Sequence, residues 1–98
     1  MEDISVQDLK QRLDNKDKFL FLDVREDWEY EEDNLGAKNI PLGELPTRLE
    51  ELEEYKNSEI IVHCRSGSRS ANAKNYLTSK GFDQVRNTLG GIVAFRNL

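Results

Sequence analysis

Residues 59–64, Glu-Ile-Ile-Val-His-Cys, restrict the possible folds of this chain more than any other stretch. Ile60, Ile61 and Val62 are three consecutive β-branched residues. Such an uninterrupted apolar run predicts a central strand that is covered on both faces, because a strand with one face in water would alternate apolar and polar residues. The predicted strand stops at Cys64, so we expect a loop to begin there.

The remaining segments alternate between strand-like and helix-like patterns. Further strands are predicted at residues 19–24, 36–42 and 84–89, and helices or helical turns at residues 5–13, 26–33, 45–55, 69–80 and 92–98. Ser5 is placed to cap the first helix, and Gly81 to end the helix that follows the Cys64 loop. Because parallel strands need crossover connections that helices supply, this order predicts an α/β sandwich with a mostly parallel sheet.

Length and charge narrow the classes of function. Ninety-eight residues suffice for one domain, so we expect residues 1–98 to form a single domain. Nineteen acidic against 14 basic residues give a net charge of −5, which disfavours nucleic acid and anionic membranes as partners. The first residues lack the pattern of a signal peptide, and no stretch approaches the ~20 apolar residues of a membrane span, so a cytoplasmic location is expected.

The loop that follows Cys64 has the composition of an anion-binding site. Cys64 is the only cysteine, so it cannot form an internal disulfide or belong to a multi-cysteine metal site. The start of a helix presents unpaired amides that favour negative charge. Gly67 lets the loop turn, and hydroxyl groups and positive charges flank it; the candidate binding residues are Arg65, Ser66, Gly67, Ser68, Arg69 and Ser70.

Cys64 has two interpretations at this stage. A lone cysteine at the end of an apolar strand is commonly a packing residue. Yet the six polar or small residues that follow, two of them arginines, favour a thiolate nucleophile, because a helix N-terminus and nearby arginines lower the pKa of a thiol from its ordinary ~8.5. His63 is expected to face away from the Cys64 side chain, because successive strand residues point to opposite faces. Trp28 is interpreted as a core or covering residue.

Two long segments of the chain resemble the rhodanese-like domains, which include single-domain thiosulfate sulfurtransferases. FLDVREDWEYEEDNLGAKNIPLGEL, residues 21–45, is similar to the first signature of that family, and IIVHCRSGSRSANAKNYLTSKGFDQVRNTLGGIVAF, residues 60–95, to its active-site strand, loop, helix and closing segment. The resemblance implies a three-layer sandwich with a five-stranded parallel sheet, and no metal or organic cofactor. Asn34 to Gly36 are one residue short of the family pattern, and Phe95 stands where tryptophan is common.

The resemblance also implies a two-step mechanism. Cys64 would take sulfane sulfur from a small anionic donor such as thiosulfate, become a persulfide, and pass the sulfur to a thiol, to cyanide or to a partner protein. The amides of residues 65–69 would hold the persulfide, and either Arg65 or Arg69 would orient the donor. Asp23 and Arg25 would support the loop, with Arg25 paired to an acid such as Glu29.

Two other functions compete with sulfur transfer. A cysteine-dependent phosphatase or arsenate reductase would use a similar anion loop, but the tyrosine-phosphatase signature places five residues between cysteine and arginine, whereas four separate Cys64 from Arg69. The third possibility is a non-catalytic rhodanese-like binding module, a role that such domains take when the cysteine is lost. Cys64 is retained here, which favours an enzyme.

Overall fold

The computed structural model describes all residues, 1–98, as an α/β fold with a parallel sheet of four strands in the order β2-β1-β3-β4. The strands are β1 (Leu20–Asp23), β2 (Lys38–Asn39), β3 (Ile60–His63) and β4 (Val85–Asn87). The α-helices are α1 (Val6–Asp14), α2 (Asp27–Glu32), α3 (Ser68–Ser79) and α4 (Gly91–Arg96), and two 3₁₀ helices are η1 (Leu42–Thr47) and η2 (Leu49–Tyr55). The predicted α/β class and parallel sheet are confirmed.

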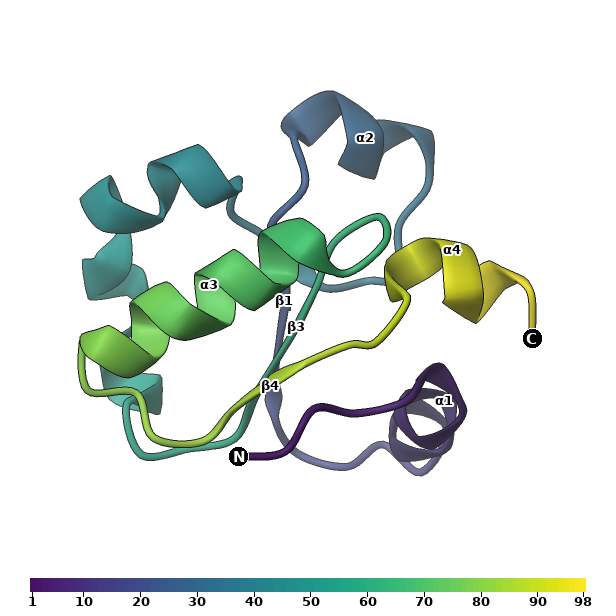
Figure 1. The fold of residues 1–98 in the computed structure, drawn as a ribbon, viewed down its shortest axis with the longest axis horizontal. Coiled ribbons are helices and arrows are strands. Elements are labelled where there is room, and N and C mark those ends of the chain that lie inside the picture. Colours follow the sequence, from purple (N-terminus) through teal and green to yellow (C-terminus); the bar gives the residue numbers. More distant parts are fainter.

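Helices cover both faces of the sheet (Figure 1). Helices α3, η1 and η2 lie on one face, α1 and α4 lie on the other, and α2 stands beyond the edge where β1 ends. The loop between β3 and α3 lies at this same edge, between α2 and α4. Carboxyl ends of parallel strands are where α/β folds bind ligands, so this edge carries the candidate site.

The resemblance to the rhodanese-like domains implied five strands, whereas the sheet has four. The segment that precedes α1 contributes only a single parallel bridge, between Ile4 and Thr88. The segment is short because Ser5 caps α1: its hydroxyl accepts a hydrogen bond from the Asp8 amide at 3.1 Å, and the helix begins at Val6. The predicted cap at Ser5 is therefore confirmed.

Each face of the sheet has its own apolar cluster. Ile60 and Val62 point toward α3 and pack with its Leu77, in a cluster of twelve buried residues that also contains Cys64. Ile61 points the other way and packs with Leu9 of α1. The run of β-branched residues in β3 is thus explained, because alternate side chains supply two different cores.

Two predicted helices differ in the structure from their sequence pattern. The segment predicted as one amphipathic helix, 45–55, lies instead within the two short 3₁₀ helices η1 and η2. Pro46 has no amide hydrogen for an α-helical bond, and Arg48 (φ −118°) interrupts the helical backbone. Helix α3 begins at Ser68, slightly before the predicted start, and ends at Ser79, with Gly81 at the C′ position as predicted.

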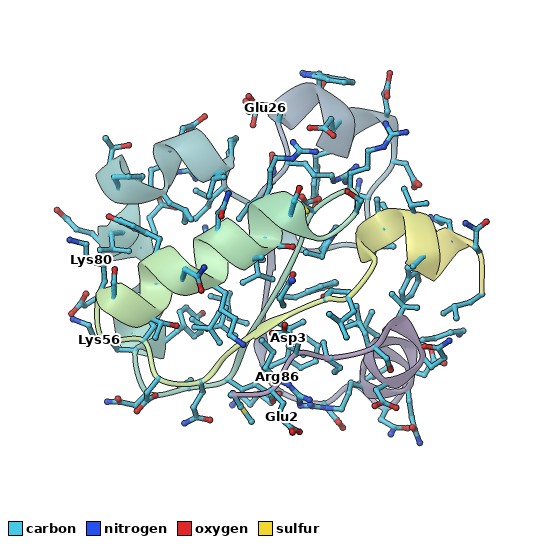
Figure 2. All side chains as sticks on the ribbon, in the orientation of Figure 1. Glu2, Asp3, Glu26, Lys56, Lys80 and Arg86 are labelled. Carbon is cyan, nitrogen blue, oxygen red and sulfur yellow. The ribbon has the colours of Figure 1, made fainter.

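Gly81 ends α3 in a Schellman motif. Its φ is +96°, its amide donates to the Thr78 carbonyl at 3.1 Å, and the Phe82 amide donates to the Leu77 carbonyl at 3.1 Å. The amino-terminal segment is fastened beside β4, where Arg86 donates to the Glu2 carbonyl at 2.8 Å and Asp3 accepts from the Asn87 amide at 3.0 Å (Figure 2). No helix in the fold has the length and apolar character needed to cross a bilayer.

Candidate active site

The Cys64 thiol lies directly beyond the carboxyl end of β3, with 1% of the residue exposed. Its Sγ accepts hydrogen bonds from the Gly67 amide at 3.1 Å and from the Ser70 amide at 3.3 Å. The Ser70 hydroxyl lies at 3.3 Å from the same sulfur. Three donors therefore converge on one sulfur atom, as expected for a site that stabilises negative charge there.

These donors set the ionisation of the thiol. Burial by itself would raise the pKa of Cys64, because a buried thiolate loses its hydration. The hydrogen bonds from the hydroxyl and amide of Ser70, and from the backbone amides of Gly67 and Ser66, outweigh burial and lower the pKa below its ordinary value. The site thus increases the thiolate fraction without any cation in direct contact with the sulfur.

The loop owes its shape to Gly67. This residue is the N-cap of α3 and has φ +113°, a conformation that side chains with a Cβ rarely adopt. The turn directs the first amides of α3 into the loop. The amides of Ser68 and Arg69, in the first helical turn, find no backbone acceptor, and they remain available to a further anionic atom beyond Sγ.

The two loop arginines, which the sequence could not tell apart, have different surroundings. Arg69 donates to both carboxylate oxygens of Glu29, at 2.6 and 2.9 Å, so its charge is already compensated by α2. Arg65 is exposed, and its guanidinium makes no ion pair and no hydrogen bond. Arg65 is therefore the cation of the loop that is free to meet a ligand.

Arg25 pairs with an acidic residue, as predicted, but that residue is not Glu29. Arg25 instead pairs with the buried Asp23, with its Nη2 at 2.8 Å and its Nε at 3.1 Å from Asp23 Oδ2. The Asp23 carboxylate has no exposed surface, so it needs a charged partner. The Glu29 carboxylate already has one in Arg69. Arg25 reaches α2 through backbone carbonyls, those of Glu29 at 3.3 Å and Asp33 at 2.8 Å.

His63 belongs to the opposite face of the sheet, as predicted. Its ring packs against Phe21 with centroids 5.2 Å apart, and Cys64 lies in the cluster under α3. Nδ1 is 3.2 Å from the Cys64 carbonyl oxygen, and Nε2 is 3.5 Å from Asp23 Oδ2. Burial lowers the pKa of this imidazole and outweighs the nearby Asp23 carboxylate, which raises it. The net effect favours the neutral ring.

Asn87 is a site residue that the sequence did not reveal. At the end of β4, its Oδ1 accepts a hydrogen bond from the Ser70 hydroxyl at 2.5 Å, and its Nδ2 donates to the Gly67 carbonyl at 3.2 Å. A hydroxyl carries one hydrogen, so Ser70 can donate to only one at a time of Asn87 Oδ1, Cys64 Sγ and the Gly67 carbonyl, which lies at 3.2 Å. The only sequence signal for Asn87 was its position at the end of a predicted strand. Parallel neighbours such as β3 and β4 end at the same edge of the sheet.

Gly91 is the second residue that sequence reasoning missed. It is the first residue of α4 and lies against the loop backbone. A Cβ at Gly91 would come within 2.6 Å of the Cys64 carbonyl oxygen. This close approach lets the next amides of α4 bind the loop: Ile92 donates to the Cys64 carbonyl at 3.0 Å and Val93 to the Arg65 carbonyl at 3.1 Å.

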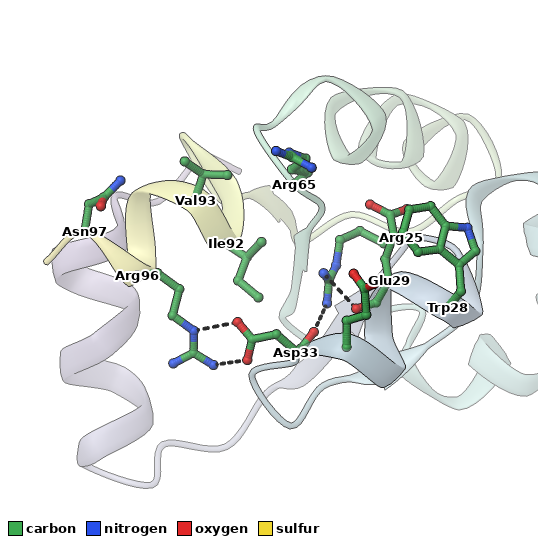
Figure 3. Close-up of a pocket in the computed structure, with 10 residues that line it drawn as sticks. Arg25, Trp28, Glu29, Asp33, Arg65, Ile92, Val93, Arg96 and Asn97 are labelled. Atoms are coloured by element: carbon green, nitrogen blue, oxygen red, sulfur yellow. Dashed lines mark hydrogen bonds and ion pairs between the residues drawn. The ribbon is translucent and has the colours of Figure 1, made fainter.

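A pocket of about 330 Å³ lies beside the loop, between α2 and α4 (Figure 3). Arg65 and Ile92 connect it to the loop, although Cys64 itself does not line it. Arg96 of α4 closes one side by donating to both carboxylate oxygens of Asp33, at 2.9 and 2.7 Å. Trp28 also lines the pocket and is 61% exposed, so of its two interpretations, as a core or a covering residue, the first is wrong.

Residues 5–98 match the family model of the rhodanese-like domain. The chain belongs to the rhodanese-like domain family. It is 41% identical over 91 residues to "Putative sulfur carrier protein YrkF" of Bacillus subtilis, covering 92% of this chain and 48% of that protein. It is 32% identical over 96 residues to a protein of Allochromatium vinosum named a sulfurtransferase, covering 97% of this chain and 88% of that one. The chain thus spans about half of the first relative.

The fold agrees with that of solved rhodanese-like domains. The crystal structure of a rhodanese-like domain protein from Staphylococcus aureus superposes with a TM-score of 0.87 at 31% identity, covering 97% of this chain and 91% of the other. The names of the relatives connect this rhodanese-like domain with sulfur transfer in general.

The two departures from the family pattern are accommodated in the fold. In the shortened connection, Asn34 Oδ1 accepts from the Gly36 amide at 2.9 Å, which closes the turn. Phe95 is half-buried and packs against the apolar cluster under α1. The final helix of this rhodanese-like domain therefore forms without the tryptophan that the family pattern places there.

Proposed function

We propose that this rhodanese-like domain is a sulfurtransferase in which Cys64 carries the sulfur as a persulfide. The observation that supports this most directly is the convergence of the Gly67 amide, the Ser70 amide and the Ser70 hydroxyl on Sγ. Such a site favours the thiolate that must attack the donor.

The first half-reaction transfers one sulfur atom. The Cys64 thiolate attacks the outer sulfur of thiosulfate, an S–S bond forms at Sγ, the S–S bond of thiosulfate breaks, and sulfite leaves with the electron pair. No external oxidant or reductant is needed, because the donor already contains sulfane sulfur. Arg65 orients the sulfonate of the donor, since its guanidinium is exposed and unpaired, while Arg69 holds the loop to Glu29.

The resulting persulfide places a second sulfur beyond Sγ, about 2.05 Å away. Its negative charge meets the amides of Ser68 and Arg69, which have no backbone acceptor. In the second half-reaction, a thiolate or cyanide attacks the outer sulfur and releases the Cys64 thiolate. The enzyme returns to its starting state with no metal or organic cofactor.

The same geometry disfavours the phosphatase alternative. A phosphatase needs its loop arginine to bind the phosphoryl oxygens, but Arg69 is committed to Glu29 through two hydrogen bonds. Moreover, two amides of the loop already donate to the sulfur of Cys64 and are not free to bind a phosphoryl oxygen.

Intact-mass spectrometry after incubation with thiosulfate tests the proposal. We expect a gain of one sulfur atom in the wild type, its removal by cyanide, and no gain in Cys64→Ala. A parallel assay with an aryl phosphate covers the competing activity. Phosphate release without sulfur uptake would establish a phosphatase. If neither activity is observed, a binding module becomes the better description.

A further inference from the structure

The pocket between α2 and α4 contains two charged groups that no other group of the protein neutralises. Most of its charged residues are paired internally: Glu29 with Arg69, and Asp33 with Arg96. Arg65, on the loop side, makes no ion pair. Glu32, on α2, likewise makes no ion pair and accepts no hydrogen bond.

Apolar side chains from both flanking helices line the same pocket. Trp28 on α2 and Val93 on α4 line the pocket and are 61% and 43% exposed, and Ile92 forms part of its wall. An exposed indole is uncommon in a small domain unless something covers it, because large apolar side chains contribute most when buried. The pocket therefore offers a bound molecule apolar contacts from α2 and from α4, one unpaired cation and one unpaired anion.

Its position connects the pocket to the sulfur chemistry. Arg65 follows Cys64 in the loop, and Ile92 donates its amide to the Cys64 carbonyl oxygen at 3.0 Å. A molecule bound in the pocket would thus lie against the loop that carries the persulfide. The volume of about 330 Å³ is at the small end of ligand pockets and suits a compound of amino-acid or short-peptide size.

We propose that this pocket is the subsite for a small zwitterionic thiol, the acceptor that removes sulfur from Cys64. Its carboxylate pairs with Arg65, its ammonium group pairs with Glu32, and its carbon chain packs on Trp28 and Val93. The proposal rests on the persulfide mechanism given above. Arg65 serves both half-reactions, because sulfite has left before the acceptor binds.

A series of four simple thiols separates these contacts. The wild-type protein is loaded with thiosulfate, freed of excess donor, and discharged with 2-mercaptoethanol, cysteamine, 3-mercaptopropionate or cysteine, and also with cyanide. Persulfide loss is followed by intact mass. Each thiol is compared with itself across variants, so differences in thiol pKa cancel.

Glu32→Gln tests the ammonium contact, and Glu31→Gln is its matched control, because Glu31 is its exposed neighbour on α2 and does not line the pocket. We expect Glu32→Gln to lower the rates at which cysteamine and cysteine discharge the persulfide, relative to the rate with 2-mercaptoethanol. The expected decrease is about two- to fivefold, which corresponds to the value of an exposed ion pair. Added salt should weaken the wild-type preference. Glu31→Gln should not change this ratio.

Arg65→Gln and Trp28→Ala test the other two contacts. Arg65→Gln should lower the rate of persulfide discharge by 3-mercaptopropionate relative to that by 2-mercaptoethanol. Trp28→Ala should lower the discharge rates with all four thiols relative to the rate with cyanide, which has no carbon chain to pack. The subsite proposal would be wrong if Glu32→Gln left the ratio of the cysteamine rate to the 2-mercaptoethanol rate unchanged, or if Glu31→Gln changed that ratio equally.

The same measurements distinguish failure of the subsite from failure of the proposed function. If wild-type Cys64 gains no sulfur from thiosulfate, the sulfurtransferase proposal fails and the subsite fails with it. If Cys64 loads and is discharged by cyanide while the thiol ratios are the same in every variant, the sulfurtransferase remains and the subsite alone is wrong.

Discussion

Arg69 and Glu29 are joined by two hydrogen bonds, of 2.6 and 2.9 Å, that connect the Cys64 loop to helix α2. Glu29 is 9% exposed, so the pair is largely shielded from water on the carboxylate side. The Arg69 guanidinium, against the opposing effect of burial, lowers the pKa of Glu29 from 4.5 to about 2. The position of the loop is therefore linked to the ionisation of a residue 40 positions away.

This link predicts a specific pH dependence of stability. A carboxylate with a lowered pKa in the folded state stabilises the fold fully above its unfolded pKa, near 4.5, and loses that contribution as the pH falls toward 2. Glu29→Gln keeps an acceptor for the Glu26 amide, which donates to Glu29 Oε1 at 3.0 Å, but removes the charge. We expect the variant to be less stable by about 1–3 kcal/mol at neutral pH, between the values of exposed and buried ion pairs.

Urea unfolding of both proteins from pH 7 to pH 2 measures this difference. The gap in the free energy of unfolding should stay constant down to about pH 4.5 and close below it. Glu31→Gln, on the exposed side of α2, should change the free energy of unfolding at neutral pH by less than about 0.5 kcal/mol. A gap between wild type and Glu29→Gln that persists at pH 2 would contradict the assignment to the ion pair.

Ser70→Ala should raise the pKa of Cys64, because the Ser70 hydroxyl lies at 3.3 Å from Sγ and contributes to the lowered pKa. A hydrogen bond to a charged group is worth about 1.5–3 kcal/mol, so at a pH below both midpoints the thiolate fraction should fall roughly tenfold or more. The pH profile of alkylation by iodoacetamide measures the midpoint directly.

Ser66→Ala is the matched control for this experiment. Ser66 contributes to the ionisation of Cys64 through its backbone amide, which alanine retains. The alkylation profile of Ser66→Ala should therefore coincide with that of the wild type. Equal shifts in the two variants would mean that general disturbance of the loop, and not the Ser70 hydroxyl, sets the pKa of the thiol.

The sequence predicted the features that depend on neighbours along the chain. The apolar run of β3, the cap at Ser5 and the glycine at 81 each act within a few residues, and the structure confirms all three. The thiol at the start of a small-residue loop was visible for the same reason. Local chemistry was sufficient to locate Cys64 at the carboxyl edge of a parallel sheet.

Features that depend on contacts between distant segments were not predictable in this way. Arg25 had both Asp23 and Glu29 within reach along the chain, and the choice between them was decided by Arg69, 40 residues beyond Glu29. Asn87 contacts Ser70 only because β4 pairs with β3. The periodicity of residues 45–55 indicated an amphipathic helix, but apolar spacing does not distinguish α-helix from 3₁₀ helix around Pro46.

Arg25→Met should destabilise the protein by about 3–5 kcal/mol, because it leaves the fully buried Asp23 carboxylate without its cation. The change also removes the hydrogen bonds from Arg25 to the carbonyls of Glu29 and Asp33, which hold the end of α2. Urea unfolding measures the loss. In the double variant Asp23→Asn/Arg25→Met, the loss should be smaller than the sum of the two single losses. Additive losses would show that the two side chains act independently.

Gly91→Ala should disrupt the contact between the start of α4 and the backbone of the Cys64 loop. The added Cβ would come within 2.6 Å of the Cys64 carbonyl oxygen, and the φ of +60° is itself unfavourable for alanine. The start of α4 must then move away, which weakens the bonds from Ile92 and Val93 to the carbonyls of Cys64 and Arg65. We expect a loss of about 2 kcal/mol or more in stability, together with slower sulfur uptake from thiosulfate.

Gly43→Ala separates this effect from the general consequence of replacing a glycine. Gly43 lies in η1 and has no positive φ, and a Cβ added there would meet no atom within 4 Å, so its replacement should be close to neutral. Stability by urea unfolding and sulfur uptake by intact mass are measured on both variants. If Gly91→Ala unfolds at the same urea concentration as Gly43→Ala and takes up sulfur at the wild-type rate, then α4 does not position the loop. If instead uptake slows while Gly43→Ala remains unaffected, the contact between α4 and the Cys64 carbonyl is required to hold the thiol in its reactive position.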